Sequence, residues 1–223
     1  MKYKAYLMDF DGTLAQSEEL KANALAHACG EHSDYAEPRY YVEVMGQDWT
    51  SVTAHFFSKS SISPNSEAFN ATFRERYVSL IEASLLPTPG ACEFIENARS
   101  VGIKLAVVSS ASSWMVDKVL QKLCMLDAFD LIITGQDVPR HKPYPDAYIM
   151  ALDNLKLCHR DALVFEDSYA GLQAARAARC ACIAIQHKYN TLHDLSAAIA
   201  VINHLKWEPL SASTIHQDDA PSE

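Results

Sequence analysis

Short apolar segments alternate along this chain with stretches of helical periodicity, and this alternation is the feature that most constrains its fold. The apolar segments are predicted to be buried strands at 5–8, 105–108, 131–134, 162–165 and 182–185. Helical patterns are found between and around them, at 91–101, 113–123, 145–155 and 169–178. Strands that alternate with helices at this spacing form βαβ units with right-handed crossovers. The sequence therefore predicts an α/β fold built around a parallel sheet.

One long segment, residues 16–87, interrupts this alternation, because it carries helical periodicity but no convincing buried strand. Ser17 is expected to cap its first helix and Gly30 to end it. Two further helices are expected, separated by a serine-rich loop, at 48–57 and 67–83. We therefore predict a core domain made of 1–15 and 88–206, with a helical domain inserted at 16–87. The polar segment 207–223 is expected to be a mobile tail.

Composition and charge exclude several classes of protein. The 223 residues are 49% hydrophobic and 21% charged, which is ordinary for a globular domain and excludes wholesale disorder. A formal net charge of −9 argues against nucleic acid or an anionic membrane as a partner. No stretch approaches the roughly 18 apolar residues of a membrane helix, and the N-terminus shows no signal-peptide pattern. A cytoplasmic location is therefore expected.

The chain contains six cysteines but no C-x-x-C pair, so a zinc ribbon or a thioredoxin-like site is unsupported. All six lie in generally apolar stretches: Cys29, Cys92, Cys124, Cys158, Cys180 and Cys182. We predict that they are buried free thiols in a reducing compartment.

Four acidic residues follow two of the predicted strands. Asp9 and Asp11 come after the first strand, with Gly12 available for a sharp turn, and Glu166 and Asp167 come after the fourth. Because ligand sites in an open parallel sheet lie beyond the carboxyl ends of the strands, these carboxylates are expected to converge in one crevice. Like charges at close range need compensation, and Mg²⁺ with its oxygen ligands fits best.

The other predicted strands are also followed by polar residues. Ser109 and Ser110 could hold a phosphate oxygen with their hydroxyls and turn amides, although taken alone this segment is better explained by a helix cap at Ser112 or Ser113. Lys142 either screens the carboxylates or is a surface lysine beside a proline turn. A crevice with these groups suits a phosphoryl group, which a neighbouring carboxylate could attack as a nucleophile.

Taken together, these motifs resemble the haloacid dehalogenase superfamily, and in particular its β-phosphoglucomutase-like phosphatases. The D-x-D-G-T motif at 9–13, Ser109, Lys142 and the acidic pair at 166–167 stand in the family's order. The resemblance implies a Rossmann-like parallel-sheet core with an inserted all-α cap, which closes over the site and selects the substrate. It also implies a Mg²⁺-dependent phosphatase acting on a small phosphorylated metabolite, such as a sugar phosphate.

The same resemblance implies roles for individual residues. Asp9 is the nucleophile that forms a phosphoaspartate, and Asp11 is the general acid and base. Lys142 orients Asp9 and neutralises charge. Mg²⁺ is bound by Asp9, by the backbone carbonyl of Asp11, by Asp167, and by Glu166 directly or through water.

Further residues are candidates for contact with the substrate. Ser109 is expected to hydrogen-bond the phosphoryl group, helped by the turn at Ser110, and Thr13 to support the loop around Asp11. Trp49 is the preferred cap candidate, with cap packing as its alternative. The same two interpretations, substrate contact or ordinary packing and solvation, apply to Tyr40, Tyr41, Arg74 and Arg76.

The sequence departs from the family pattern at several positions. Gln16 stands where an acid is common, and Lys21 where the mutase-like pattern expects a histidine. The segment 46–49 lacks the arginine that would hold a second phosphate, which argues for hydrolysis and against a mutase. Arg179 or Cys180 holds a helix-ending position where glycine is usual, and is expected to be left-handed.

Several alternatives to a phosphatase remain. A phosphomutase is disfavoured by the cap, and a dehalogenase by the acids suited to phosphate and metal. Cleavage of a phosphonate C–P bond would need a cap lysine that forms a Schiff base; Lys21 and Lys59 are available, but both are better explained as solvated surface lysines. A non-catalytic binding protein is disfavoured because Asp9, Asp11 and Lys142 are all present. A monomer is expected.

Overall fold

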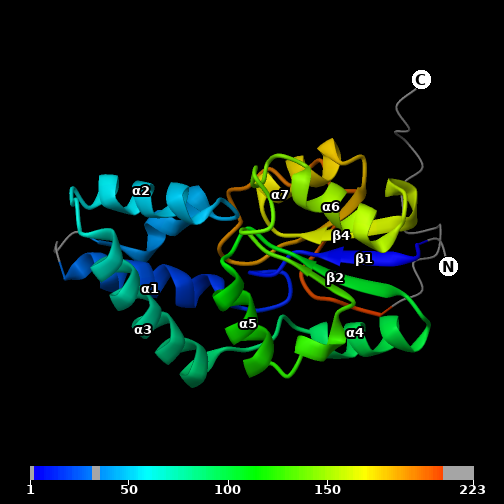
Figure 1. Ribbon diagram of the computed structural model, residues 1–223, viewed down its shortest axis with the longest axis horizontal. Helices are drawn as coiled ribbons and strands as arrows, with labels where there is room; N and C mark the ends of the chain where they lie inside the picture. Colours follow the sequence, from blue (N-terminus) through cyan, green and yellow to red (C-terminus); the bar gives the residue numbers. More distant parts are fainter. Residues whose placement is uncertain (1–2, 32–35, 208–223) are drawn as a thin grey trace.

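The computed structural model describes residues 3–31 and 36–207, and these form a sheet domain with a helical insert at one end (Figure 1). Apart from Trp207, the predicted tail lies outside the described residues. Trp207 packs its ring against Phe94, with 5.8 Å between the ring centroids. In this part of the chain no helix has the length and apolar character needed to cross a bilayer.

The described sheet has six parallel strands in the order β3-β2-β1-β4-β5-β6. The strands are β1 (Ala5–Met8), β2 (Lys104–Val108), β3 (Leu131–Ile133), β4 (Ala162–Glu166), β5 (Ala181–Ile185) and β6 (Ala200–Ile202). The five predicted strands are confirmed to within a residue or so at either end. The sequence analysis missed β6, because this short edge strand is only half buried and carries no buried apolar run.

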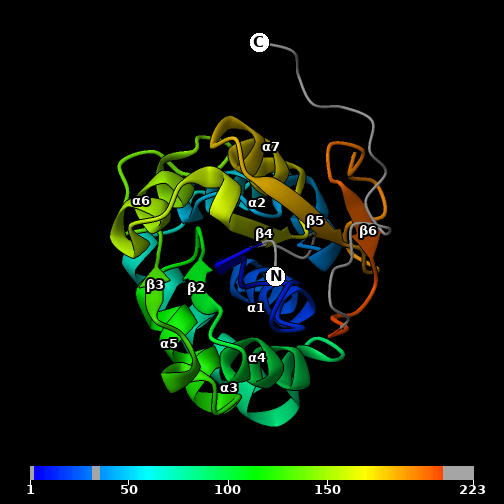
Figure 2. The ribbon, with the colours of Figure 1, turned by 90° about the vertical axis from the view of Figure 1, so that its right-hand side faces the viewer.

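Helices cover both faces of the sheet, as Figure 2 shows from the side of the N-terminus. On one face, alternate strand residues such as Tyr6 and Leu105 pack against α4 (Ala91–Ser100) and α5 (Ser113–Lys122). On the other face, residues such as Leu7 and Val164 pack against α6 (Asp146–Leu155) and α7 (Tyr169–Ala177). Two short 3₁₀ segments lie in the connections of the sheet domain: η2 (Leu126–Ala128) precedes β3, and η3 (His159–Asp161) precedes β4. Burial on both faces explains why the strands are apolar runs.

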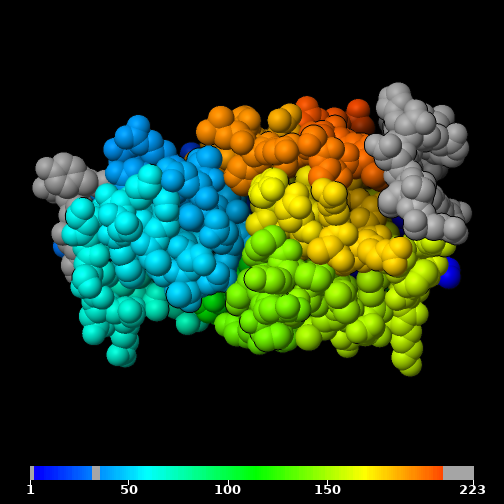
Figure 3. All heavy atoms as spheres, turned by 90° about the horizontal axis from the view of Figure 1, so that it is seen from above, coloured from blue at the N-terminus to red at the C-terminus, as the bar shows by residue number. Residues whose placement is uncertain are grey.

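The insert lies beyond the carboxyl ends of the strands (Figure 1). It consists of α1 (Glu18–Gly30), the 3₁₀ segment η1 (Pro38–Val44), α2 (Trp49–Lys59) and α3 (Ser66–Ser84). The Asp48 side chain caps α2 and the Asn65 side chain caps α3, each by accepting two backbone N–H bonds. The space-filling view shows the insert and the sheet domain as two lobes that meet along one seam (Figure 3). The assignment of 16–87 as a separate cap domain stays a prediction.

Some local expectations were wrong. Ser17 stands before α1 but makes no side-chain cap: its backbone is already helical (φ −93°, ψ −14°), and its hydroxyl donates to Asp11. Ser112 precedes α5 without a side-chain cap. A cap is found, in contrast, before α7, where the Ser168 hydroxyl accepts from the backbone N–H of Gly171. The segment η1 was missed because a short 3₁₀ segment leaves no helical period in the sequence.

The cysteine prediction was right for only half of the thiols. Cys29, Cys180 and Cys182 are buried and free, whereas the other three are free but exposed, namely Cys92, Cys124 and Cys158. Cys124 has a left-handed backbone (φ 56°) in the turn after α5, where its neighbours do not enclose it. The expected left-handed residue after α7 is Arg179, with a φ of 61°.

Candidate active site

The loop after β1 brings two carboxylates to the carboxyl edge of the sheet. The Asp9 N–H donates to the Phe165 carbonyl at 2.8 Å and so continues the ladder between β1 and β4. Gly12 then turns the chain with a φ of 75°. A Cβ at this position would lie 2.1 Å from Oδ2 of Asp167. Glycine is therefore required here both for the turn and for the close approach of the two loops.

Lys142 reaches this edge from the loop before α6 and is 95% buried, so the interpretation as a surface lysine was wrong. Its ammonium contacts the carboxylates of Asp9 and Glu166 and donates to the Val108 carbonyl at 2.9 Å. Burial acts to lower the pKa of Lys142, but the two carboxylates outweigh burial and raise the pKa above its usual range. Lys142 is therefore a fixed positive charge that links three strands of the sheet.

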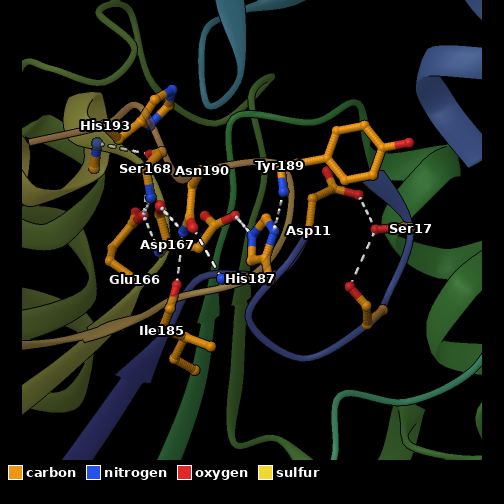
Figure 4. Close-up of polar contacts among 12 residues, drawn as sticks. Asp11, Ser17, Glu166, Asp167, Ser168, Ile185, His187, Tyr189, Asn190 and His193 are labelled. Carbon is orange, nitrogen blue, oxygen red and sulfur yellow. Dashed lines mark hydrogen bonds and ion pairs between the residues drawn. The ribbon is translucent and has the colours of Figure 1, made fainter. Parts of the chain in front are cut away.

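Glu166 has both carboxylate oxygens occupied by protein donors and is wholly buried. Its Oε1 accepts from Lys142 and from the Tyr148 hydroxyl at 2.7 Å. Its Oε2 accepts from the backbone N–H of Asp167 at 3.1 Å and from both the N–H and the hydroxyl of Ser168 (Figure 4). Of the two modes left open by the sequence, this saturation favours metal binding through water over direct ligation.

Asp167 is held by two residues that sequence reasoning missed. His187 Nε2 lies 2.8 Å from its Oδ2, and the Asn190 side-chain amide donates to its backbone carbonyl and to that of Ile185, at 2.7 Å each (Figure 4). Burial lowers the pKa of His187. Both residues lie in the loop that follows β5, which ends at Ile185, so the rule that placed Asp9 and Glu166 at the carboxyl edge could have found them.

The geometry brings Asp9, Glu166 and Asp167 close enough to share a metal ion, since one ligand atom from each lies within 4.8 Å of the others. Burial, followed by the Glu166 charge, raises the pKa values of both Asp9 and Asp167, while Lys142 acts in the opposite direction. Lys142 alone therefore does not neutralise the cluster. A divalent cation with oxygen ligands fits this set of donors.

The fourth carboxylate, Asp11, points toward the insert. Ser17 donates to its Oδ1 at 2.5 Å, and the Lys21 ammonium contacts its Oδ2. Lys21 is 94% buried, so the interpretation as a solvated lysine was wrong for this residue. Burial acts to lower the pKa of Lys21, yet Asp11 and Glu18 raise the pKa above its usual range. Lys59, in contrast, stays at the surface in an ion pair with Glu43.

A crevice between the insert and the sheet domain reaches this cluster, with about 470 Å³ of space including the open mouth. Asp9, Asp11 and Asp167 line it from the sheet edge, with Ser109 and Ser110 beside them. The insert contributes Glu18, Lys21, Tyr41, Gln47 and Trp49. Trp49 lines the crevice, but its ring also packs 4.4 Å from that of Phe73 and its Nε1 donates to Asn70, so substrate contact stays a prediction beside cap packing.

Other candidates do not line the crevice. Thr13 is wholly buried away from it, so its position fits support of the loop and not direct contact with a substrate. The guanidinium of Arg74 packs over the Trp114 ring at 4.4 Å, and Tyr40 packs against Phe56. Arg76 is exposed on α3, outside the residues that line the crevice.

Comparison with known proteins decides the family. The sequence pattern of the haloacid dehalogenase-like hydrolases matches residues 6–185 of the chain. The chain belongs to this family. As a haloacid dehalogenase-like hydrolase, it carries the Asp9–Lys142–Asp167 cluster at the same carboxyl edge of the sheet where the resemblance implied an active site.

Curated relatives of the chain include CbbY proteins and proteins named as phosphatases. The chain is 30% identical over 208 residues to the protein CbbY of Rhodobacter capsulatus, covering 89% of this chain and 92% of CbbY. It is 28% identical over 192 residues to hexitol phosphatase A of Escherichia coli, covering 86% and 87% of the two chains.

Among solved structures, CbbY from Rhodobacter sphaeroides in complex with xylulose-(1,5)bisphosphate superposes with a TM-score of 0.80 and 28% identity. That alignment covers 91% of this chain and 94% of CbbY. This haloacid dehalogenase-like chain is thus an enzyme of the hydrolase type, and its homologues include phosphatases of phosphorylated metabolites.

Proposed function

We propose that this protein is a Mg²⁺-dependent phosphatase that hydrolyses a small phosphorylated metabolite, such as a sugar phosphate, through a phosphoaspartate on Asp9. The observation that carries the proposal is the Asp9 carboxylate, which lines the crevice while Lys142 holds its Oδ1. A carboxylate with one oxygen fixed by an ammonium is oriented for attack through its other oxygen. Relatives with phosphatase names support the same reaction.

Asp9, Asp167 and the carbonyl of Asp11 are the groups that would bind Mg²⁺, with Glu166 acting through water. When bound, Mg²⁺ supplies positive charge that offsets the carboxylates and the phosphoryl oxygens. Ser109 is suited to the phosphoryl group because its buried hydroxyl oxygen accepts from the Ala111 N–H at 3.0 Å. That bond leaves the hydroxyl proton of Ser109 available for a phosphoryl oxygen.

Asp11 would protonate the leaving oxygen and then remove a proton from the attacking water. Ser17 donates to its Oδ1 and the Lys21 ammonium contacts its Oδ2, so both carboxylate oxygens are held from the side of the insert. Lys21 is therefore a positioning residue of the insert that holds the Asp11 carboxylate from α1.

Hydrolysis of a phosphate ester fits the crevice better than the phosphomutase reaction or phosphonate cleavage. A phosphomutase must hold two phosphoryl groups, yet among the described residues Lys21 is the sole Lys or Arg that lines the crevice. Cleavage of a phosphonate through a Schiff base needs an uncharged amine, which requires a lowered pKa. Lys21 is close enough to be considered for that role, but its pKa is raised and its ammonium is paired with Asp11.

The test is release of phosphate from a panel of phosphorylated metabolites by the wild type and by Asp9→Asn, with Mg²⁺ or with a chelator. We expect release with Mg²⁺ by the wild type alone. Turnover by Asp9→Asn at the wild-type rate, or full activity in chelator, would contradict the proposal. A monomeric state and a cytoplasmic location stay predictions, which size measurement and imaging can check.

A further inference from the structure

The carboxylate of Asp167 is held differently from the other three acids of the sheet edge. Each of those three contacts a lysine ammonium, that of Lys142 or of Lys21. Among the described residues, the one donor to the Asp167 carboxylate is instead His187, whose Nε2 lies 2.8 Å from Oδ2 (Figure 4). Only 2% of the Asp167 side chain and 22% of the His187 side chain are exposed, so this contact is largely shielded from bulk water.

The backbone fixes which nitrogen of the His187 ring carries the proton. The Tyr189 N–H donates to Nδ1 at 3.2 Å (Figure 4). Because a ring nitrogen that accepts a hydrogen bond carries no proton, the proton of the imidazole lies on Nε2, which faces Asp167. His187 is therefore a neutral donor to Oδ2.

Asn190 ties the turn that carries His187 to the end of β4. Its wholly buried amide nitrogen donates to the backbone carbonyls of Asp167 and Ile185, at 2.7 Å each. Its Oδ1 accepts from the His187 N–H at 2.8 Å. One side chain thus joins the ends of β4 and β5 to the backbone of His187, so the imidazole is presented to Asp167 by a cross-linked turn.

Gly12 encloses the same carboxylate oxygen from the loop after β1. A Cβ on this glycine would lie 2.1 Å from Oδ2 of Asp167 and 2.7 Å from Nε2 of His187. Oδ2 is therefore committed to protein contacts. Oδ1 accepts no hydrogen bond from the residues that the structure describes, and Asp167 lines the crevice, so Oδ1 is the oxygen left for a ligand.

A neutral donor suits a metal-binding carboxylate better than an ammonium does. An ammonium offsets the charge of the carboxylate and repels a divalent cation nearby. An imidazole N–H orients the carboxylate and leaves its negative charge in place. Asp9 shares its charge with Lys142, whereas Asp167 offers a cation its full charge from a fixed position.

We propose that His187 is a positioning residue that orients the Asp167 carboxylate through a neutral hydrogen bond, and so sets the affinity of the site for Mg²⁺. This inference rests on the Mg²⁺ site of the proposed function. It assigns a role to the loop after β5, which the proposed reaction does not otherwise use.

Calorimetric titration of the full chain with Mg²⁺ alone measures this role without turnover. The variants are His187→Ala, which removes the donor, and His187→Gln, whose side-chain amide keeps a neutral N–H. His193→Ala is the matched control from the same loop. The His193 ring also accepts a backbone N–H at Nδ1, from Tyr169, but its Nε2 faces the Val42 carbonyl at 3.2 Å and not a carboxylate.

In His187→Ala we expect the dissociation constant for Mg²⁺ to rise by about ten- to a hundredfold, the usual effect of removing a hydrogen-bond partner of a metal ligand. His187→Gln should restore most of the affinity, because its amide can donate to Oδ2. His193→Ala should bind Mg²⁺ like the wild type.

Three results would overturn the inference. The first is an unchanged dissociation constant in His187→Ala. The second is a loss in His187→Gln as large as in His187→Ala, which would mean that the ring and not the donated bond matters. The third is an equal loss in His193→Ala, which would mean that the loop acts only through its fold.

A second variant covers the case in which His187→Ala fails to fold by circular dichroism. His187→Phe keeps a ring of similar shape but has no donor, so it takes the place of His187→Ala in the comparison. Mg²⁺ binding by His187→Phe at the wild-type affinity would then count against the inference.

Phosphate release separates this inference from the phosphatase proposal. Mg²⁺-dependent release by the wild type, with an affinity for Mg²⁺ that does not depend on His187, would overturn the role of His187 alone. An affinity that depends on His187, without phosphate release from any compound of the panel, would overturn the phosphatase proposal alone. A wild type that binds no Mg²⁺ would overturn both.

Discussion

Replacing Gly171 by alanine is expected to destabilise the protein, although the same change in an ordinary helix interior is stabilising. Gly171 lies in the first turn of α7, directly above the Glu166 carboxylate. A Cβ at this position would lie 1.9 Å from Cδ of Glu166 and 2.1 Å from its Oε2. The Glu166 side chain cannot simply move aside, because Lys142 and Tyr148 hold it in place.

The magnitude follows from two opposing effects. Helix propensity favours alanine over glycine by up to about 1 kcal/mol. Against this, moving Glu166 breaks its buried ion pair with Lys142, and breaking such a pair by removing one partner costs about 3–5 kcal/mol. The net expectation is a loss of about 2–4 kcal/mol in the free energy of unfolding. The displacement of Glu166 therefore outweighs the helix propensity of alanine and makes the substitution destabilising.

Urea denaturation of the wild type and Gly171→Ala at neutral pH measures this difference. Gly30→Ala is the matched control, since Gly30 also lies in a helix but has no atom within 4 Å of the added Cβ, and it should gain up to about 1 kcal/mol. In a Glu166→Ala background the clash disappears, so Gly171→Ala should be neutral or stabilising there. The reasoning would be refuted if Gly171→Ala lowered the free energy of unfolding equally in both backgrounds. It would also be refuted if the Gly171→Ala single variant were as stable as the wild type.

Three further predictions concern the crevice. Asp9→Asn should lower phosphate release by at least about a thousandfold with its circular dichroism spectrum unchanged, because the nucleophile alone is removed; residual turnover near the wild-type value would contradict this. Lys21→Met should lower kcat by about ten- to a hundredfold, because Asp11 loses the ammonium that holds its Oδ2; a change in KM alone would argue against positioning. Burial raises the pKa of Glu18 in the folded protein to about 8, whereas its usual value is 4.5. The unfolded chain therefore loses this proton at a lower pH than the folded protein does. As a result, the free energy of unfolding should fall as the pH rises from 4.5 to about 8. Glu18→Gln should remove about 3 kcal/mol of that fall, measured by urea denaturation at pH 5 and pH 8, and an identical pH dependence in both proteins would count against the shift.

The main features of the core could be predicted because they depend on local signals. Burial on both faces makes parallel strands apolar, which is why the runs around Leu7 and Val164 were visible. The carboxyl-edge rule then placed Asp9 and Asp167 in one crevice before any contact was known. β6 was not predicted, because an edge strand that is half exposed needs no apolar run.

The sequence by itself determined which acids stand at the carboxyl edge of the sheet, because strand period and chain direction are local properties. Only the tertiary structure decided whether a given lysine is a surface group or a buried counter-ion. The sequence analysis interpreted Lys21 and Lys59 alike as solvated lysines, yet Lys21 is buried against Asp11 and Lys59 pairs with Glu43 at the surface. The charge state and role of Lys21 likewise depend on how α1 packs against Asp11, a contact that no local pattern encodes.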